Sequence, residues 1–298
     1  MTKQQATVGF IGLGTMGREM VINLMKAGYA VHAYDVRREA VDDVATQGAV
    51  AAGSVAGAAA NADIVITMLP DTPQVEEVVL GPGGLLAAPP PGRLVVDMST
   101  IAPQAVRRMH EALKGVGVAL LDAPVSGGPQ GAKNAALSIM VGGDAAAFER
   151  AKPFFAAMGT TINHVGATGA GQTVKLCNQL ICGINIQAIC EALALGRASG
   201  VDLAQLRQVL LGGSAASWML DKLGPAMIEG DVRAGFRIDL MFKDLRLVQE
   251  LAQALFVPLP ATALVTSQYV DARAHGEGGN GNQALFRVYD RMTGQGRP

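Results

Sequence analysis

The stretch Val-Gly-Phe-Ile-Gly-Leu-Gly-Thr-Met-Gly at residues 8–17 decides the fold of the first half of the chain. Its apolar first part, Val8–Ile11, predicts a buried strand, and a helical pattern follows the glycines. Gly12 permits a tight turn, Gly14 allows a close backbone approach to a pyrophosphate, and Gly17 lets the helix pack against the strand. The sequence therefore predicts a dinucleotide phosphate site at the helix start, made of Gly12, Leu13, Gly14, Thr15, Met16 and Gly17.

An acidic residue follows the next predicted strand, Ala30–Tyr34. At this position the Asp35 carboxylate can accept hydrogen bonds from both ribose hydroxyls of NAD and would repel the 2′-phosphate of NADP. Arg37 and Arg38 favour NADP if either of them pairs with that phosphate, and otherwise they belong to a solvated helix start. The sequence predicts NAD(H) as the favoured cofactor, with NADP(H) as the alternative.

The two halves of the chain differ in their secondary-structure pattern. Up to about Gly166, short apolar strands alternate with helices, which is typical of a parallel sheet covered on both faces. The strands are expected at residues 8–11, 30–34, 64–69, 94–97, 118–121, 137–141 and 161–165. Beyond Gly166, helices are expected at residues 171–199, 203–211, 243–255, 262–275 and 283–292. We therefore predict an α/β fold: a Rossmann-type doubly wound dinucleotide-binding domain at 1–167, an all-α substrate and oligomerisation domain at 168–298, and a long interdomain helix.

Composition and charge exclude several classes of protein. Half of the 298 residues are hydrophobic and 16% are charged, which suits a large buried core and does not suit a disordered chain. A formal net charge of −1 and an aromatic content of 4% give no basis for binding nucleic acid or an anionic membrane. The chain start lacks a signal-peptide core, and the apolar segment Val174–Ala198 carries too many polar side chains for a membrane span. We expect a cytoplasmic protein in which this segment forms a buried helix.

The cysteines and histidines do not have a metal-binding spacing. Cys177, Cys182 and Cys190 fall in one predicted helix and are expected to be small buried thiols. The four histidines are scattered along the chain. The sequence therefore predicts no metal site.

Two further strand ends supply candidate contacts for the cofactor. Ligands of open α/β sheets bind at the carboxyl ends of the strands, where Met68, Leu69 and Pro70 are expected. Thr100 follows another predicted strand. Its hydroxyl is expected either to form a hydrogen bond near the nicotinamide or to cap the helix that begins near Pro103.

Two motifs supply groups suited to substrate binding and proton transfer. Ser126, Gly127 and Gly128 offer a hydroxyl and two bare backbone N–H groups, which suit a carboxylate; a plain glycine turn is the alternative. Lys175 and Asn178 are three residues apart on the predicted long helix and share a face. Near the helix N-terminus the macrodipole and burial both favour a neutral lysine, as a general acid–base group requires, whereas a lysine with a buried stem and a solvated amine is the alternative.

The chain resembles the β-hydroxyacid dehydrogenases, because four motifs occur in the order found in that family. The motifs are Gly12–Gly17, Asp122–Gly128, Gly169–Gln179 and Phe242-Lys243-Asp244-Leu245. The resemblance runs from about Val8 to about Met292, and residues 175–179 and 235–240 resemble tartronate semialdehyde (2-hydroxy-3-oxopropionate) reductases most. It implies an NAD(P)-dependent oxidoreductase that interconverts a small 3-hydroxy acid and its semialdehyde, either that reductase or a 3-hydroxyisobutyrate dehydrogenase.

The resemblance also implies roles for single residues. Lys175 is then the catalytic acid–base, Asn178 helps to orient the substrate, and the Ser126-Gly127-Gly128 turn holds the substrate carboxylate. Thr100 and Lys243 are expected to contact cofactor or substrate near the nicotinamide.

Other functions on the same scaffold are alternatives: a sulfolactaldehyde reductase, an imine reductase, or a non-catalytic dinucleotide-binding interaction module. Some relatives carry Asn-Asn where this chain has Asn178-Gln179, so we assign no role to Gln179. The expected partners are a small carboxylated substrate and further copies of the chain, in a homodimer or homotetramer, because the apolar faces of an extended helix need cover.

Overall fold

The computed structural model describes residues 6–294, and the chain divides into two compact units after Lys175. This division falls inside helix α8 (Ala170–Ala198), whereas the sequence analysis placed the boundary at residues 167/168, ahead of that helix. The first residues of α8 group with the first unit because their backbone is hydrogen-bonded to a strand end of that unit.

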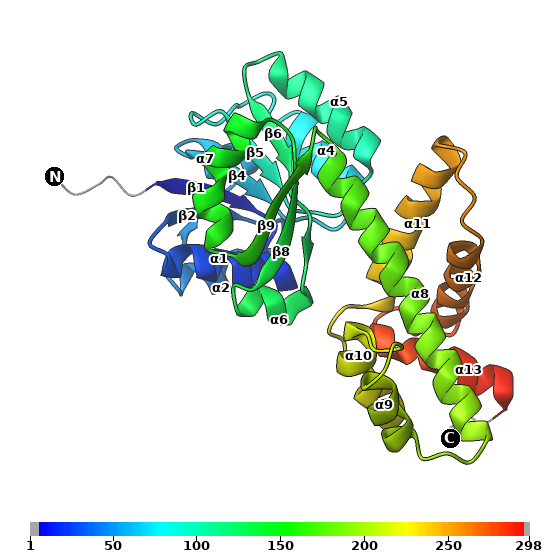
Figure 1. Ribbon diagram of the computed structural model, residues 1–298. Helices are drawn as coiled ribbons and strands as arrows, with labels where there is room; N and C mark the ends of the chain where they lie inside the picture. Colours follow the sequence, from blue (N-terminus) through cyan, green and yellow to red (C-terminus); the bar gives the residue numbers. More distant parts are fainter. Residues whose placement is uncertain (1–5, 295–298) are drawn as a thin grey trace. The chain divides into compact units, whose positions relative to one another are not determined.

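The first unit alternates strands and helices, as the sequence predicted (Figure 1). Its elements are β1 (Thr7–Ile11), α1 (Thr15–Lys26), β2 (Ala30–Tyr34), α2 (Arg38–Ala45), β3 (Val50–Ala51), α3 (Val55–Ala59), β4 (Ile64–Thr67), α4 (Thr72–Leu80), β5 (Leu94–Asp97), α5 (Pro103–Lys114), β6 (Ala119–Asp122), β7 (Val125–Ser126), α6 (Gly128–Lys133), β8 (Leu137–Gly142), α7 (Ala145–Ala156) and β9 (Gly159–Gly166).

The strands form one sheet, which has nine members within the described residues. Its order is β3-β2-β1-β4-β5-β6-β8-β7, with β9 pairing with β8, and β1 to β6 are parallel to their neighbours. The direction of winding reverses between β1 and β4, which is the switch point where doubly wound sheets bind ligands. The sheet is not parallel throughout, because β8 runs antiparallel to β6 and β7.

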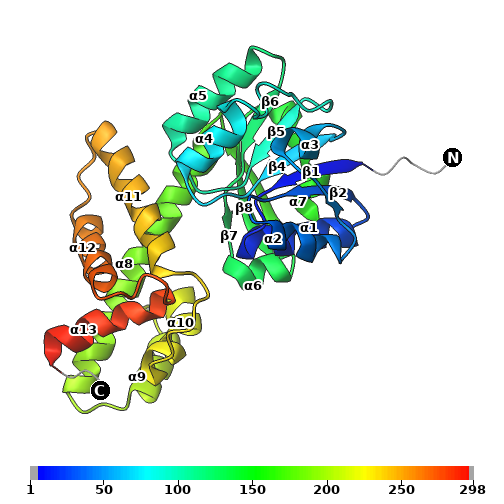
Figure 2. The ribbon, with the colours of Figure 1, turned by 180° about the vertical axis from the view of Figure 1, so that it is seen from behind.

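Helices cover both faces of this sheet, and each face has its own apolar core (Figures 1 and 2). One core joins alternate residues of β1, such as Phe10, to α1, α2, α6 and α7. The other joins Ile11 and Val65 to α3, α4 and α5. Burial on both sides explains why β4 and β5 are continuous apolar runs that are fully buried.

The second unit is helical. It holds most of α8, then α9 (Leu203–Leu211), α10 (Trp218–Glu229), α11 (Ile238–Ala254), α12 (Pro260–Ala274), the 3₁₀ turn η1 (Asn282–Leu285) and α13 (Phe286–Thr293). The sequence analysis missed α10 and began α11 at Lys243, but the structure begins it at Ile238. Trp218, at the start of α10, is 60% exposed.

Helix α8 is long and apolar enough to cross a membrane by length and composition alone, but only 44% of its most apolar window is buried. The expectation of a buried helix is therefore only partly correct: one face packs against the core, while Ile181 and Leu195 are exposed. The expected burial of the cysteines is also correct only in part, because Cys190 is buried and Cys177 is exposed.

Candidate active site

The glycine loop connects β1 to α1 with the backbone geometry that a dinucleotide site needs. Gly12 has φ of +99°, and a Cβ there would collide with the carbonyl oxygen of Met68. A Cβ on Gly17 would collide with the carbonyl oxygen of Gly12, so the close packing of helix and strand requires glycine at this position too.

Gly14 differs from the other two glycines, because a Cβ there would meet no atom within 4 Å. Gly14 is also the N-cap of α1, which no side chain caps. The loop therefore leaves open space beside a helix N-terminus whose first N–H groups have no side-chain acceptor, and a dinucleotide pyrophosphate fits both features.

Asp35 lies directly behind this loop. It accepts a hydrogen bond from the Leu13 amide at 2.7 Å and pairs with the Arg37 guanidinium, whose Nε lies 3.1 Å from Oδ1. Burial raises the pKa of Asp35, but the hydrogen bonds from Arg37 and Leu13 outweigh it and hold the pKa below its usual value. Asp35 is thus a carboxylate at neutral pH, and Arg37 is engaged with it, while Arg38 pairs with Asp42 on α2.

The end of β4 lies next to the loop in the sheet. The Met68 amide donates to the Ile11 carbonyl at 2.9 Å, and Met68 and Leu69 are half-buried while Pro70 is exposed. These three residues therefore stand at the switch point, where the sequence analysis expected them.

Thr100 is held in place by a buried glutamine from α8. Gln172 Nε2 donates to the Ser99 carbonyl at 2.8 Å, and its Oε1 accepts from the Ile101 amide at 3.1 Å. The Ser99 hydroxyl in turn accepts from the Leu69 amide at 2.8 Å. Gln172 thus clamps the backbone on both sides of Thr100, and helix α5 uses Ala102 as its N-cap, so the structure does not support a capping role for Thr100.

The Ser126-Gly127-Gly128 turn connects β7 to the short helix α6. Ser126 is half-buried in β7, where it pairs with Ser138 of β8. Gly127 has φ of +126° and Gly128 of +61°, values that favour glycine at both positions, and no side chain caps α6. The turn thus presents backbone amides beside a hydroxyl.

Asp122 at the end of β6 anchors the start of α8. Its two carboxylate oxygens accept from the Gly169 amide at 2.7 Å and from the Gln172 amide at 2.8 Å. Lys175 follows within the next turn of the helix and is only 6% exposed. A buried lysine close to a helix N-terminus is unfavourable for stability, which makes it a candidate for chemistry.

Asn178 and Lys243, two predicted site residues of the second unit, are connected through two residues to which the sequence analysis assigned no role. Asn178 Nδ2 donates to Gln179 Oε1 at 2.8 Å, and Gln179 Nε2 donates to Asp244 Oδ2 at 2.6 Å. Asp244 Oδ1 lies 2.8 Å from Lys243 Nζ. Gln179 and Asp244 are 4% and 2% exposed, so this polar chain runs through the interior of the unit.

The residues that sequence reasoning missed are Asp122, Gln172, Gln179 and Asp244. One signal was available for Asp122: α8 begins after Gly169-Ala170 with no local capping side chain, so an acceptor had to come from elsewhere in the chain. The other three act through hydrogen bonds that link distant positions of the chain, and no local pattern marks them.

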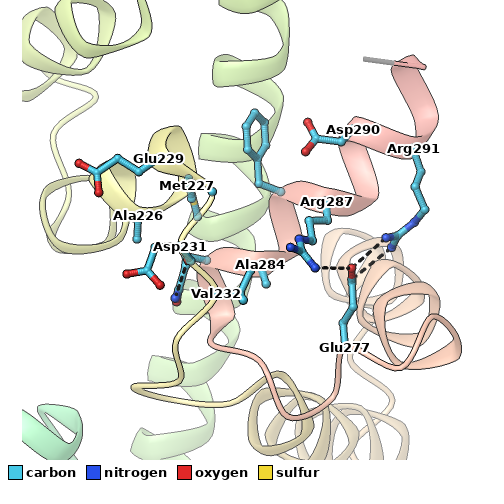
Figure 3. A pocket seen from close by; sticks show the side chains of 13 residues that line it. Ala226, Met227, Glu229, Asp231, Val232, Glu277, Ala284, Arg287, Asp290 and Arg291 are labelled. Carbon is cyan, nitrogen blue, oxygen red and sulfur yellow. Dashed lines mark hydrogen bonds and ion pairs between the residues drawn. The ribbon is translucent and has the colours of Figure 1, made fainter. Parts of the chain in front are cut away.

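A cavity of about 490 Å³ lies elsewhere in the second unit, between α10, η1 and α13 (Figure 3). Arg287 and Arg291 both pair with Glu277 at its wall. None of the predicted site residues lines it. Residues 6–294 also contain no group of three or more His, Cys, Asp or Glu side chains placed to hold a metal ion.

Comparisons with known proteins agree with this geometry. Residues 7–166 match the family model of the NAD binding domain of 6-phosphogluconate dehydrogenase. Residues 169–289 match the model described as NAD-binding of NADP-dependent 3-hydroxyisobutyrate dehydrogenase.

Similar proteins cover almost the whole chain. The 2-hydroxy-3-oxopropionate reductase of Escherichia coli (strain K12) is 42% identical over 286 residues, which cover 96% of this chain and 98% of that protein. The NAD-dependent L-serine dehydrogenase of Pseudomonas aeruginosa is 41% identical, covering 97% of this chain and 99% of that protein. Among solved structures, a Mycobacterium tuberculosis 3-hydroxyisobutyrate dehydrogenase with L-serine has a TM-score of 0.88 and 34% identity, covering 96% of this chain and 99% of that chain.

The fold and the glycine loop define an NAD(P)-dependent oxidoreductase. The chain belongs to the β-hydroxyacid dehydrogenase family, as its four ordered motifs indicated.

Proposed function

We propose that the protein interconverts a small 3-hydroxy acid and its semialdehyde, with 2-hydroxy-3-oxopropionate or the semialdehyde of 3-hydroxyisobutyrate as the carbonyl form. The observation that carries this proposal is the buried Lys175 on a helix whose start is anchored by Asp122. Relatives named for these substrates, and an L-serine dehydrogenase, support a substrate with a carboxylate and an oxidisable terminal carbon.

In this proposal each protein group has one task. The Ser126 hydroxyl and the amides of Gly127 and Gly128 hold the substrate carboxylate and so position the carbon that reacts. Lys175 donates a proton to the substrate oxygen during reduction and accepts it during oxidation, which is worth roughly 10²–10⁴ in rate. When bound at the glycine loop, the nicotinamide dinucleotide supplies or accepts the hydride.

We further propose that NAD(H) is favoured over NADP(H). The Asp35 carboxylate lies behind the phosphate loop, and its charge opposes a 2′-phosphate. Arg37, the nearest cation that could attract that phosphate, is already paired with Asp35. Thr100 and Lys243 are proposed as contacts to cofactor or substrate near the nicotinamide. A homodimer or homotetramer is also proposed, and a cytoplasmic location stays a prediction.

The decisive test is substitution of Lys175. Lys175→Ala should lower kcat by about 10²–10⁴, equivalent to roughly 3–5 kcal/mol of transition-state stabilisation, while the Kd of the dinucleotide stays within about twofold. Lys175→Arg should restore little activity, because a guanidinium holds its proton too tightly to give it up near neutral pH.

The rates are measured with glycerate and 3-hydroxyisobutyrate, with NAD and NADP in turn. Lys222→Ala, which removes an exposed lysine of α10, is the control and should leave kcat unchanged. Near-native turnover of Lys175→Ala at saturating cofactor would remove this lysine from the mechanism.

A further inference from the structure

Two helices of the second unit approach each other closely around the buried polar chain that connects Asn178 to Lys243. Gly183 of α8 packs against Leu245 of α11, where an added Cβ would lie 3.2 Å from Leu245 Cδ2. Gln179 and Asp244 are neighbours of these two residues in sequence, and the close approach brings their side chains within hydrogen-bond distance.

The buried carboxylate of Asp244 determines how the Gln179 amide is oriented. An ionised carboxylate can only accept hydrogen bonds, and Asp244 is paired with the Lys243 ammonium. Gln179 must therefore turn its NH₂ group toward Asp244, and Nε2 lies 2.6 Å from Oδ2. The same NH₂ group also faces the sulfur of Met241, at 3.9 Å.

The orientation of Gln179 in turn determines that of Asn178. With its NH₂ group on Asp244, Gln179 presents only its Oε1 to Asn178, and Oε1 can only accept. Asn178 Nδ2 donates to it at 2.8 Å and also faces Cys182 Sγ at 3.5 Å. Both amide hydrogens of Asn178 are therefore engaged, and the carbonyl oxygen Oδ1 is the group that Asn178 has left to offer.

From this chain we infer that Gln179 and Asp244 are positioning residues, which make Asn178 a hydrogen-bond acceptor toward the substrate. An acceptor at this place selects acids whose second carbon carries a donor, either a hydroxyl or an ammonium group, over acids that carry a methyl group there. The inference rests on the proposed function, in which Asn178 contacts the substrate, and it narrows the substrate class of that site.

Three acids that differ at the second carbon test this inference: glycerate, with a hydroxyl that donates or accepts; L-serine, with an ammonium that only donates; and 3-hydroxyisobutyrate, with a methyl group that does neither. The kcat/KM of each acid is measured with the complete chain and saturating NAD. The wild-type protein should prefer glycerate and L-serine over 3-hydroxyisobutyrate by at least about tenfold, the effect of one hydrogen bond in a protected site.

Asp244→Asn reverses the polarity of the chain without changing its shape. The new carboxamide keeps its oxygen on the Lys243 ammonium and turns its NH₂ group to Gln179, so that Gln179 and then Asn178 must turn over. Asn178 would then present an NH₂ group, which a hydroxyl tolerates and an ammonium does not. The ratio of kcat/KM for L-serine to that for glycerate should therefore fall by at least about tenfold.

Gln179→Met interrupts the chain instead of reversing it. Both ratios to 3-hydroxyisobutyrate should fall by about threefold to tenfold, because Asn178 is then free to present either group. Gln187→Met is the matched control: Gln187 is also a buried glutamine of α8, 7% exposed, but it donates to Glu191 within the helix. Its ratios should equal those of the wild type.

Several outcomes would overturn the inference. One is a wild-type preference for 3-hydroxyisobutyrate, and another is an equal loss on all three acids in both Gln179→Met and Asp244→Asn, as a purely structural role predicts. A thermal-shift series with the protein, NADH and each acid gives a readout that does not depend on turnover, and it should show the same order of acids. Absence of turnover of all three acids by the wild type, with either cofactor, would instead contradict the proposed function.

Discussion

Three glycines of one loop have different physical roles at the residue scale. Gly12 and Gly17 are required by the fold, because a side chain at either position would collide with backbone. Gly14 has φ of −67°, which any residue adopts, and open space where its Cβ would be. The requirement for glycine at position 14 therefore comes from the ligand, and at the other two positions it comes from the packing.

This difference predicts opposite effects of two alanine substitutions. Gly14→Ala should change the free energy of unfolding by no more than about 0.5 kcal/mol but raise the Kd of the dinucleotide at least about tenfold, because the new methyl group occupies the approach of the phosphates. Gly12→Ala should lower the free energy of unfolding by about 1–3 kcal/mol, because φ of +99° strains any residue with a Cβ. Urea denaturation and fluorescence titration with NADH measure the two quantities. Equal losses of stability in both variants would contradict this assignment.

At the scale of single elements, α8 depends on an acceptor from another element. Asp122 of β6 takes the place of a local N-cap, and its burial raises its pKa to about 6 although the Gly169 and Gln172 amides act in the opposite direction. The folded protein therefore holds this proton more tightly than the unfolded chain does between about pH 4 and pH 6.

The contribution of Asp122 to stability should therefore depend on pH with a defined sign. It is fully present below the ordinary pKa of 3.8 and is lost as pH rises through about 6, a change of up to roughly 3 kcal/mol. The difference in free energy of unfolding between wild type and Asp122→Asn should shift in favour of the wild type as pH falls from 6.5 to 4. Denaturation curves at several pH values measure it, and a difference that does not change over this range would contradict the raised pKa.

The same scale shows how a broken helical pattern can still form a helix. Pro225 interrupts α10 and lacks the N–H that would bond to the carbonyl of Asp221. Arg207 of α9 donates to that carbonyl at 2.7 Å and to the Leu220 carbonyl at 3.0 Å. The side chain of a neighbouring helix thus replaces the missing backbone donor.

At the scale of the whole molecule, the exposed side of α8 indicates association between copies of the chain. Ile181 and Leu195 are 57% and 71% exposed, and they lie on one stripe of the helix with Ala188, at intervals of seven residues. Apolar stripes of this kind are covered in most soluble proteins.

Sedimentation at micromolar concentration should therefore show a species larger than the 30.7 kDa of a single chain. The double variant Ile181→Glu and Leu195→Glu should shift the distribution toward 30.7 kDa, because charged side chains cannot be buried unpaired in an interface. Val36→Glu, at a position that is 88% exposed in the first unit, is the control and should leave the distribution unchanged. A wild-type protein that sediments only as a single chain would contradict the prediction.

The sequence by itself was sufficient for the dinucleotide half of the protein. The strand, glycine loop and helix at residues 7–26 and the acid Asp35 depend on local periodicity and on backbone angles that only glycine adopts freely. The α/β then all-α organisation also follows from local patterns, because strands buried on both faces are continuous apolar runs and amphipathic helices are not.

The tertiary structure alone decided how the site residues are held. Gly169 and Gln172 reach Asp122, Ser99 and Ile101 over separations of 47 to 73 residues, and Gln179 reaches Asp244 over 65. The reversal of β8 and the existence of α10 likewise depend on partners outside the segment, in the neighbouring strands and in Arg207. Local sequence determines which backbone conformation a segment prefers. Which donor meets which acceptor is decided only when distant segments pack, because a buried polar group must find its partner wherever the fold places one.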